Sequence, residues 1–128
     1  MVKVGLFGAG HLGRIHLKLL KQIEGIEVVG VCDLDEQVRA KVQEEWDVPV
    51  FADADTLLNQ VDAADIVVPT LSHHQLAKKA LLAGKHVFIE KPVTHTLAEA
   101  DDLLALHAQR PDLCVQVGHV ERFNPAFL

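Results

Sequence analysis

Short apolar stretches rich in valine and isoleucine alternate along the chain with segments of helical period. This alternation is typical of parallel βαβ units, in which a helix follows each strand and crosses to the next one. The stretches are nearly continuous in their apolar character, as strands covered on both faces are. They comprise residues 3–7, 27–32, 48–51, 65–68, 86–89 and 114–117. The sequence therefore predicts an α/β fold with a doubly wound parallel sheet of about six strands and helices on both faces.

Apolar residues between these stretches recur at spacings of three or four, which places them on one face of a helix. The four stripes are Leu12, Ile15, Leu19 and Ile23; Val38, Val42 and Trp46; Leu76, Ala77, Ala80 and Leu81; and Leu97, Ala100, Leu103, Leu104 and His107. Gly84 and Arg110-Pro111 are stop signals after the last two helices. We expect the stripes to pack on the sheet as ordinary core.

The size and charge of the chain exclude several classes of protein. It has 128 residues, 49% of them hydrophobic, which suits one domain with its own core. The formal net charge is −6 and the longest basic cluster is Lys78-Lys79, so no nucleic-acid partner is expected. The apolar runs are far shorter than the roughly 20 residues that cross a bilayer. No secretion signal follows Met1, so we expect no membrane partner and a cytoplasmic location.

The cysteines and histidines do not form a metal site in the sequence. Cys32 and Cys114 belong to no C-x-x-C pair and are predicted to be buried strand residues. Eight histidines are present, but His73 and His74 are adjacent and so point in different directions. No carboxylate or cysteine completes a set at ligand spacing, and no metal is expected.

A glycine-rich loop, Gly8-Ala9-Gly10-His11-Leu12-Gly13, joins the first predicted strand to the first predicted helix. In a dinucleotide-binding loop, the first glycine permits a tight turn, the second lets the backbone approach a pyrophosphate, and the third brings helix and strand together. The helix start offers unpaired amides and a positive dipole end to the phosphates. We predict that Gly8, Gly10, His11, Leu12 and Gly13 bind the cofactor, with His11 over the pyrophosphate. The alternative is an ordinary strand–helix turn.

Asp33 ends the second predicted strand, 20 residues beyond Gly13. A carboxylate at this point of a Rossmann-type fold accepts hydrogen bonds from the adenosine ribose, and it repels a 2′-phosphate. The next three residues add no cation, and the nearest base, Arg39, either turns back toward the ribose or points away. The predicted cofactor is NAD in preference to NADP.

The fifth predicted strand ends in Glu90-Lys91-Pro92. Ligands of such a sheet bind at the carboxyl ends of its strands, so we expect Lys91 over the cofactor. A partly desolvated ammonium there can hydrogen-bond a substrate hydroxyl and stabilise the alkoxide that develops as hydride leaves its carbon. Lys91 is the predicted catalytic residue. The alternative is a surface lysine in a strand–helix loop.

Two segments carry a resemblance to a known family. They are Val68-Pro69-Thr70-Leu71-Ser72-His73 and Ala83-Gly84-Lys85-His86-Val87-Phe88-Ile89-Glu90-Lys91-Pro92. The chain resembles, from Lys3 to Pro125, the nucleotide domain of the Gfo/Idh/MocA oxidoreductases, the group of glucose-fructose oxidoreductase and inositol dehydrogenase. The resemblance implies a Rossmann domain for NAD or NADP, with Lys91 at the nicotinamide and substrate and a cis Lys91-Pro92 peptide.

The same resemblance adds residues to the predicted cofactor site. His73 falls on the family's histidine, four residues after Pro69, and Thr70 stands near the position where the family often has an asparagine. Pro69, Thr70, His73, Glu90 and Lys91 are therefore expected to bind the cofactor.

The resemblance also implies a division of the chain. Residues 1–118 are the expected Rossmann dinucleotide-binding domain, and residues 119–128 are the expected start of the crossing to a C-terminal substrate domain that this chain lacks. The tail from Gly118 to Pro125 looks most like family members that act on nucleotide sugars, and His119 is a candidate to face substrate. We expect this chain to bind cofactor without turning over substrate alone. A homo-oligomer of the full-length protein stays open.

Three functions follow from these motifs. The first is the nucleotide-binding half of an oxidoreductase that transfers hydride between the nicotinamide and a secondary alcohol of a sugar, nucleotide sugar or cyclitol. The second is a non-catalytic NAD-sensing module, which has no need of a lysine at the nicotinamide. The third is an enzyme like the related biliverdin reductases. Glu90-Lys91-Pro92 separates the first from the second.

Overall fold

Six parallel strands form one sheet in the computed structural model, which describes residues 1–118. The strands are β1 (Val2–Phe7), β2 (Ile26–Cys32), β3 (Val50–Phe51), β4 (Ala63–Ile66), β5 (His86–Glu90) and β6 (Val115–Gly118). Their order in the sheet is β3-β2-β1-β4-β5-β6, and all neighbouring pairs are parallel. This is the strand order of dinucleotide-binding sheets, which places a crevice between β1 and β4 where the order reverses. The predicted doubly wound sheet is confirmed.

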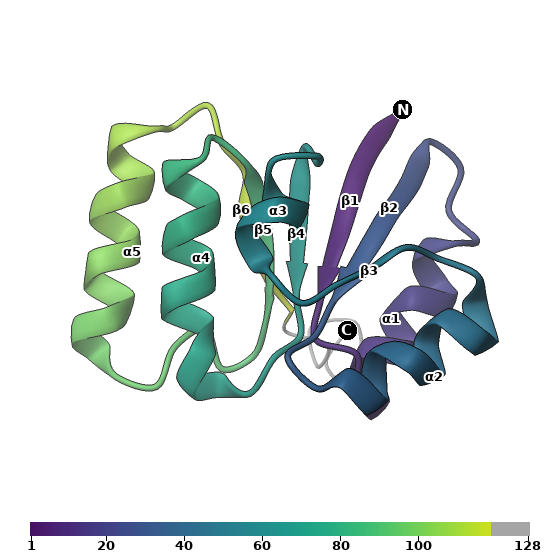
Figure 1. Ribbon diagram of the computed structural model, residues 1–128. Coiled ribbons are helices and arrows are strands. Elements are labelled where there is room, and N and C mark those ends of the chain that lie inside the picture. The colour runs from purple at the N-terminus through teal and green to yellow at the C-terminus, as the bar shows by residue number, and fades with distance from the viewer. Residues whose placement is uncertain (119–128) are drawn as a thin grey trace, which may run out of the picture.

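Helices cover both faces of the sheet (Figure 1). On one face lie α1 (His11–Leu20) and α2 (Glu36–Trp46), and on the other lie α3 (Ala54–Leu58), α4 (His73–Leu82) and α5 (Leu97–Gln109). A 3₁₀ turn, η1 (Thr70–Ser72), leads into α4. Apolar periodicity did not predict α3 and η1, because five and three residues are too few to show a helical stripe.

Two clusters of buried apolar side chains hold the helices to the sheet. Successive residues of a strand point to opposite faces, so Leu6 and Phe7 of β1 enter different clusters. The cluster under α1 and α2 contains Leu6, Leu17, Val31 and Val42, and the larger one contains Phe7, Leu57, Ile66, Ala77, Ala80, Leu81, Ile89 and Leu103. The stripes predicted for α2 and α4 therefore do face the sheet.

The predicted packing face of α1 is wrong. Its four residues are between 42 and 53% exposed: Leu12, Ile15, Leu19 and Ile23. The helix buries Gly13 and Leu17 instead. A Cβ at Gly13 would lie 2.0 Å from the carbonyl oxygen of Gly8, so the helix meets the strand at this glycine. That close approach fixes the rotation of α1 and leaves the more regular apolar stripe outside.

Two smaller expectations also differ from the structure. In α5, Leu103 is buried, but Leu97 and Leu104 are exposed, because this helix packs beside α4 at the edge of the sheet and buries only a narrow stripe. Cys32 is buried as predicted, whereas Cys114 is exposed because it lies just before β6, an edge strand.

Candidate functional site

A groove of about 830 Å³ lies at the carboxyl ends of β1, β2 and β4. Seven of the predicted site residues line it: Gly8, Gly10, His11, Leu12, Gly13, Asp33 and Pro69. Gln75, Leu76 and Lys79 of α4 also line the groove. The loop, the acid and the end of β4 thus come together in one cavity, at the crevice where a Rossmann sheet binds its ligand.

Each of the three loop glycines occupies a different structural environment. Gly8 has φ +100°, and a Cβ there would lie 2.5 Å from the carbonyl oxygen of Val67. Gly13 admits the close approach of α1 to Gly8. A Cβ at Gly10, by contrast, would meet nothing within 4 Å, although Gly10 lines the groove. The fold therefore requires the first and third glycines, whereas the second borders open space at the groove.

The start of α1 is prepared for an anion. Gly10 is its N-cap, no side chain caps the helix, and no acidic residue stands in its first turn. The amides of this turn and the positive end of the helix dipole are therefore left to a ligand. This agrees with the predicted placement of a pyrophosphate.

Asp33 is held in place by the backbone on both sides. Its Oδ2 accepts a hydrogen bond of 2.9 Å from the Ala9 amide, and its Oδ1 accepts one of 2.9 Å from the Asp35 amide. Each carboxylate oxygen keeps acceptor capacity for a further donor. Arg39 turns back toward the site and donates from Nη1 to the Asp33 carbonyl oxygen at 2.8 Å. The carboxylate is thus presented to the groove in a fixed position.

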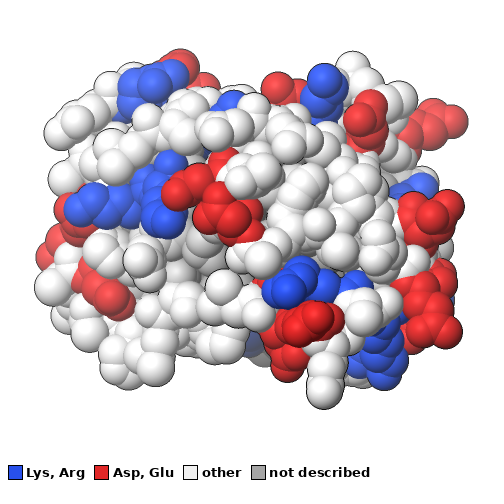
Figure 2. Space-filling model, in the orientation of Figure 1, with Lys and Arg blue, Asp and Glu red and all other residues white. Residues whose placement is uncertain are grey.

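The surroundings of Asp33 are mainly acidic. Asp35, Asp53 and Lys79 also line the groove, and the Arg39 guanidinium lies at the Asp33 carbonyl oxygen. Figure 2 shows acidic and basic side chains interspersed over the visible face, with no broad basic field. Burial, and then the charge of Asp33, raise the pKa of the Cys32 thiol to about 11. Cys32 therefore lines the groove as a protonated thiol and not as a nucleophile.

The second group of predicted residues lies at the same edge of the sheet, beside the groove. Ile66 of β4 pairs with Ile89 of β5, so the residues that follow these strands leave the sheet next to each other. Lys91 is exposed, and the predicted cis peptide between Lys91 and Pro92 is confirmed. Thr70, His73, Glu90 and Lys91 do not line the groove itself.

His73 lies behind the groove and not on its wall, in contrast to its expected contact with the cofactor. It is 2% exposed. Its Nδ1 lies 2.8 Å from the carbonyl oxygen of Pro92, and its Nε2 lies 2.8 Å from that of Val68. Both ring nitrogens therefore face carbonyl oxygens, and the nitrogen that carries a proton donates to its partner, so the ring lies between the loop after β5 and the loop after β4.

A buried cluster of His16, Asp65 and Glu90 was missed by sequence reasoning. His16 Nδ1 lies 2.8 Å from Asp65 Oδ2, and Nε2 lies 2.8 Å from Glu90 Oε1. The hydrogen bond to Asp65 raises the pKa of His16 against the opposing effect of burial, and burial raises the pKa of Asp65. Asp65 inside an apolar strand was the available signal, because a buried carboxylate needs a partner.

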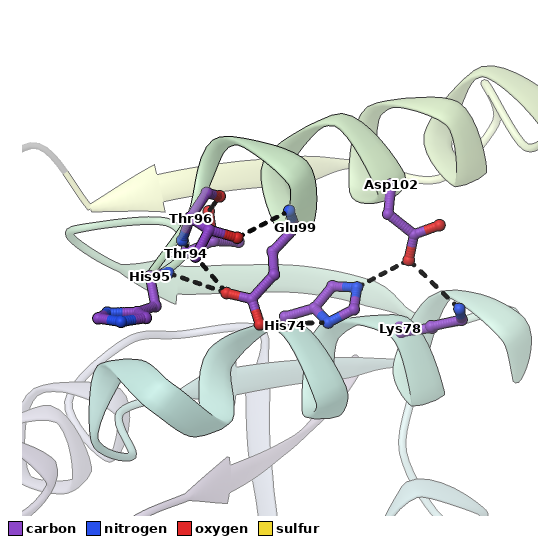
Figure 3. A network of polar contacts seen from close by, with 7 residues as sticks. All are labelled: His74, Lys78, Thr94, His95, Thr96, Glu99 and Asp102. Carbon is purple, nitrogen blue, oxygen red and sulfur yellow. Dashed lines mark hydrogen bonds and ion pairs between the residues drawn. The ribbon is translucent and has the colours of Figure 1, made fainter.

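His74 belongs to a separate network between α4 and α5 (Figure 3). Its Nε2 lies 2.7 Å from Asp102 Oδ2, and its Nδ1 lies 3.6 Å from Glu99 Oε2. Lys78 donates to the same Asp102 oxygen at 3.2 Å. These contacts join two helices on the outer face, so the two adjacent histidines serve different parts of the fold.

Neither a metal centre nor a membrane span is found in the part of the chain that the structure describes. Within residues 1–118, no three His, Cys, Asp or Glu side chains gather as metal ligands. The helices of that range are too short or too polar to cross a bilayer. His119 lies outside the described residues.

Comparison with known proteins decides the family. Residues 2–119 match the sequence profile of GFO_IDH_MocA, described as "Oxidoreductase family, NAD-binding Rossmann fold". The chain belongs to this family. It is an NAD-binding Rossmann domain, and the predicted resemblance and cofactor are confirmed.

Relatives of this Gfo/Idh/MocA domain include several dehydrogenases. It is 39% identical to UDP-N-acetylglucosamine 3-dehydrogenase of Acidithiobacillus ferrooxidans, over 98% of this chain and 39% of that protein. It is 35% identical to inositol 2-dehydrogenase 1 of Saccharopolyspora erythraea, over 99% of this chain and 39% of that protein. The chain therefore spans about two fifths of the length of these relatives.

A solved structure gives the same fold with ligands bound. It is scyllo-inositol dehydrogenase from Lactobacillus casei with bound cofactor NAD(H) and scyllo-inositol. The TM-score is 0.91 at 31% sequence identity, over 98% of this chain and 38% of that one.

Proposed function

We propose that this chain is the cofactor-binding half of an NAD-dependent oxidoreductase that acts on a CH–OH group. The proposed substrate is a secondary alcohol of a sugar, nucleotide sugar or cyclitol. The observation that carries the proposal is the position of Lys91. Lys91 follows the carboxyl end of β5, on the side of the sheet where the groove lies. His73 contacts both Pro92, the residue after Lys91, and Val68, which lines the groove.

The residues of the groove fit the cofactor. The space beside Gly10, in which a Cβ would meet no atom within 4 Å, suits a pyrophosphate against the start of α1. Asp33, fixed by two backbone amides, has free lone pairs for the ribose hydroxyls. Asp33, Asp35 and Asp53 bring more negative charge to this end of the groove than Lys79 and Arg39 offset, which opposes a 2′-phosphate and supports NAD over NADP. A dinucleotide held by these residues would supply the hydride acceptor or donor for the substrate carbon.

Lys91 supplies the electrostatic stabilisation of the reacting oxygen in this proposal. Its ammonium donates a hydrogen bond to the substrate oxygen and stabilises the negative charge that grows there in the transition state. A cation at a fixed point over the strand ends acts more strongly on the transition state than on the neutral alcohol, so it raises the rate more than the affinity. In this proposal the proton acceptor and the wall that excludes water come from a substrate domain.

The dehydrogenases among the relatives support this function over the NAD-sensing module and the biliverdin reductase-like enzyme. We further infer that residues 1–118 form the dinucleotide-binding domain and that residues 119–128, which lie outside the described residues, begin the crossing to a substrate domain. A cytoplasmic location and a sugar-like substrate belong to the same proposal, with no nucleic-acid partner and with a homo-oligomer left open.

Calorimetric titration of the 128-residue chain with NADH tests the first half of the proposal. We expect one binding site, and Lys91→Ala should leave the affinity within about threefold because Lys91 acts on the transition state. Where the gene continues beyond this sequence, its whole product should oxidise such an alcohol and lose most of its kcat in Lys91→Ala. No NADH binding by the wild type, or an unaltered kcat in the variant, would contradict the proposal.

A further inference from the structure

Lys91 stands between two residues that each contact a histidine, one partly buried and one buried. Glu90, before it, is bonded to His16, and Pro92, after it, is bonded to His73. Both contacts measure 2.8 Å. The lysine itself is exposed. The exposed Lys91 side chain therefore belongs to a three-residue segment, 90–92, whose first and last residues are each held by a histidine.

The His16 side chain joins three elements, α1, β4 and β5. The ring comes from α1 and lies between Asp65 of β4 and Glu90 of β5, with Phe88 of β5 edge-on at a centroid distance of 6.0 Å. The side chains of His16, Asp65 and Glu90 are 14, 7 and 12% exposed. Hydrogen bonds between charged partners in such a site are stronger than neutral ones, and a ring with two carboxylate partners cannot rotate without losing one of them.

A second contact holds Glu90 from β6. A Cβ at Gly118 would lie 3.2 Å from Glu90 Oε1, so the end of β6 packs closely against the carboxylate. Glu90 is therefore bonded on one side and packed on another. The next residue along the chain, Lys91, is exposed.

The His73 contact fixes the other side of Lys91. The ring joins the Pro92 carbonyl oxygen to the Val68 carbonyl oxygen, and Val68 lines the groove. The segment that carries the lysine is thus tied to the groove wall through one buried side chain. Neither ring nitrogen of His73 is left to contact a ligand.

We propose that His16 and His73 are positioning residues for Lys91, which they hold at the groove by fixing Glu90 and Pro92. This rests on the proposed function, because it gives the lysine a place beside the nicotinamide. Reacting groups must be held within roughly 0.5 Å of the productive geometry, and this takes side chains locked by packing and hydrogen bonds behind them. A lysine on a flexible four-carbon stem gains most from a fixed backbone.

The test measures the response of the Lys91 side chain to the cofactor separately from the affinity for the cofactor. Lysines of the 128-residue chain are ¹³C-methylated, and the Lys91 signal is assigned by its loss in Lys91→Arg. The change of this signal on addition of NAD⁺ is then compared in the wild type, His16→Gln and His73→Gln. Binding of ADP-ribose, which lacks the nicotinamide, measures the rest of the site. His74→Gln is the matched control, because His74 is ion-paired on the outer face between α4 and α5.

We expect His16→Gln and His73→Gln to lose at least half of the NAD⁺-induced change in the Lys91 signal. The Kd of ADP-ribose should stay within about threefold of the wild-type value. His74→Gln should behave as the wild type does. Unchanged Lys91 responses in folded His16→Gln and His73→Gln would overturn the positioning roles alone. A wild-type Lys91 signal that ignores NAD⁺ would instead overturn the proposed function on which they rest.

A second measurement covers the case in which a variant does not fold. In the wild type, a deprotonated His16 has one N–H for two carboxylates, so one contact weakens. The groups that face this ring are Asp65 from β4 and Glu90 from β5, with Lys91 next along the chain. The NAD⁺-induced change at Lys91 should therefore decline with the same midpoint as the His16 ring signal. A response that stays constant through that midpoint would overturn the role of His16.

Discussion

Gly10→Val should abolish binding of NADH and leave the fold intact. The backbone of Gly10 has φ −68° and ψ −162°, an extended conformation that does not require glycine, and a Cβ there would meet nothing within 4 Å. Valine is a poorer N-cap than glycine, which costs about 1 kcal/mol at most. The added methyl groups enter the groove at the start of α1, where the pyrophosphate is proposed to lie.

The loss of affinity can be estimated from the contacts displaced. A hydrogen bond to a charged group is worth roughly 1.5–3 kcal/mol. If the side chain keeps the pyrophosphate from two amides of the first turn, binding weakens by roughly 3–6 kcal/mol, or about a hundredfold to ten-thousandfold. Calorimetric titration with NADH measures the affinity, and urea unfolding measures the stability.

Gly13→Ala is the matched control for this prediction. Its Cβ would lie 2.0 Å from the Gly8 carbonyl oxygen, so either the helix or the loop must move. We expect a stability loss above about 3 kcal/mol from this backbone clash, against about 1 kcal/mol for Gly10→Val. A Gly10→Val chain that binds NADH as tightly as the wild type would refute the placement of the pyrophosphate. Equal stability losses in the two variants would instead contradict the close helix–strand contact assigned to Gly13.

Three further outcomes are expected. The wild-type chain should bind NADPH at least tenfold more weakly than NADH. With NADPH, Asp33 loses a charge-assisted hydrogen bond to the ribose, worth roughly 1.5–3 kcal/mol, and repels the added phosphate. Equal affinities by calorimetry would contradict this prediction. Because the folded-state pKa of His16 is raised above 6.5, its contribution to stability is present below pH 6.5 and is lost as the pH rises through that higher value. Urea unfolding should therefore show the wild-type advantage over His16→Gln shrinking above pH 6.5, and a pH-independent difference would count against the buried ion pairs. The 128-residue chain alone should reduce no NAD⁺ with sugars, nucleotide sugars or cyclitols, because half a pocket cannot hold the substrate carbon for transfer; steady turnover in a spectrophotometric assay would disprove it.

The strand pattern and the glycine loop were predictable because their physical requirements are local. Each strand is a short apolar run between turn signals, and the loop needs small residues at fixed offsets from a strand end. Asp33 followed from its distance to Gly13 along the same βαβ unit. These features depend on residues that are close in sequence, so periodicity and spacing were sufficient to find them.

The rotation of α1 and the histidine contacts were not predictable in this way. Leu12 and Ile15 lie on the more regular stripe of α1, yet the backbone contact at Gly13 decides which side faces the sheet. His16 finds its partners 49 and 74 residues away. Such contacts depend on strand order and register, which the sequence pattern does not specify residue by residue.

The most direct test of the account maps the cofactor on the ¹⁵N-labelled chain by amide chemical shifts. NAD⁺ and ADP-ribose should both move the amides of residues 8–13 and of Asp33, and only NAD⁺ should also move Lys91. That result would place the adenosine and pyrophosphate in the groove and the nicotinamide at the end of β5. Shift changes that are absent, or that centre away from the glycine loop, would contradict the account.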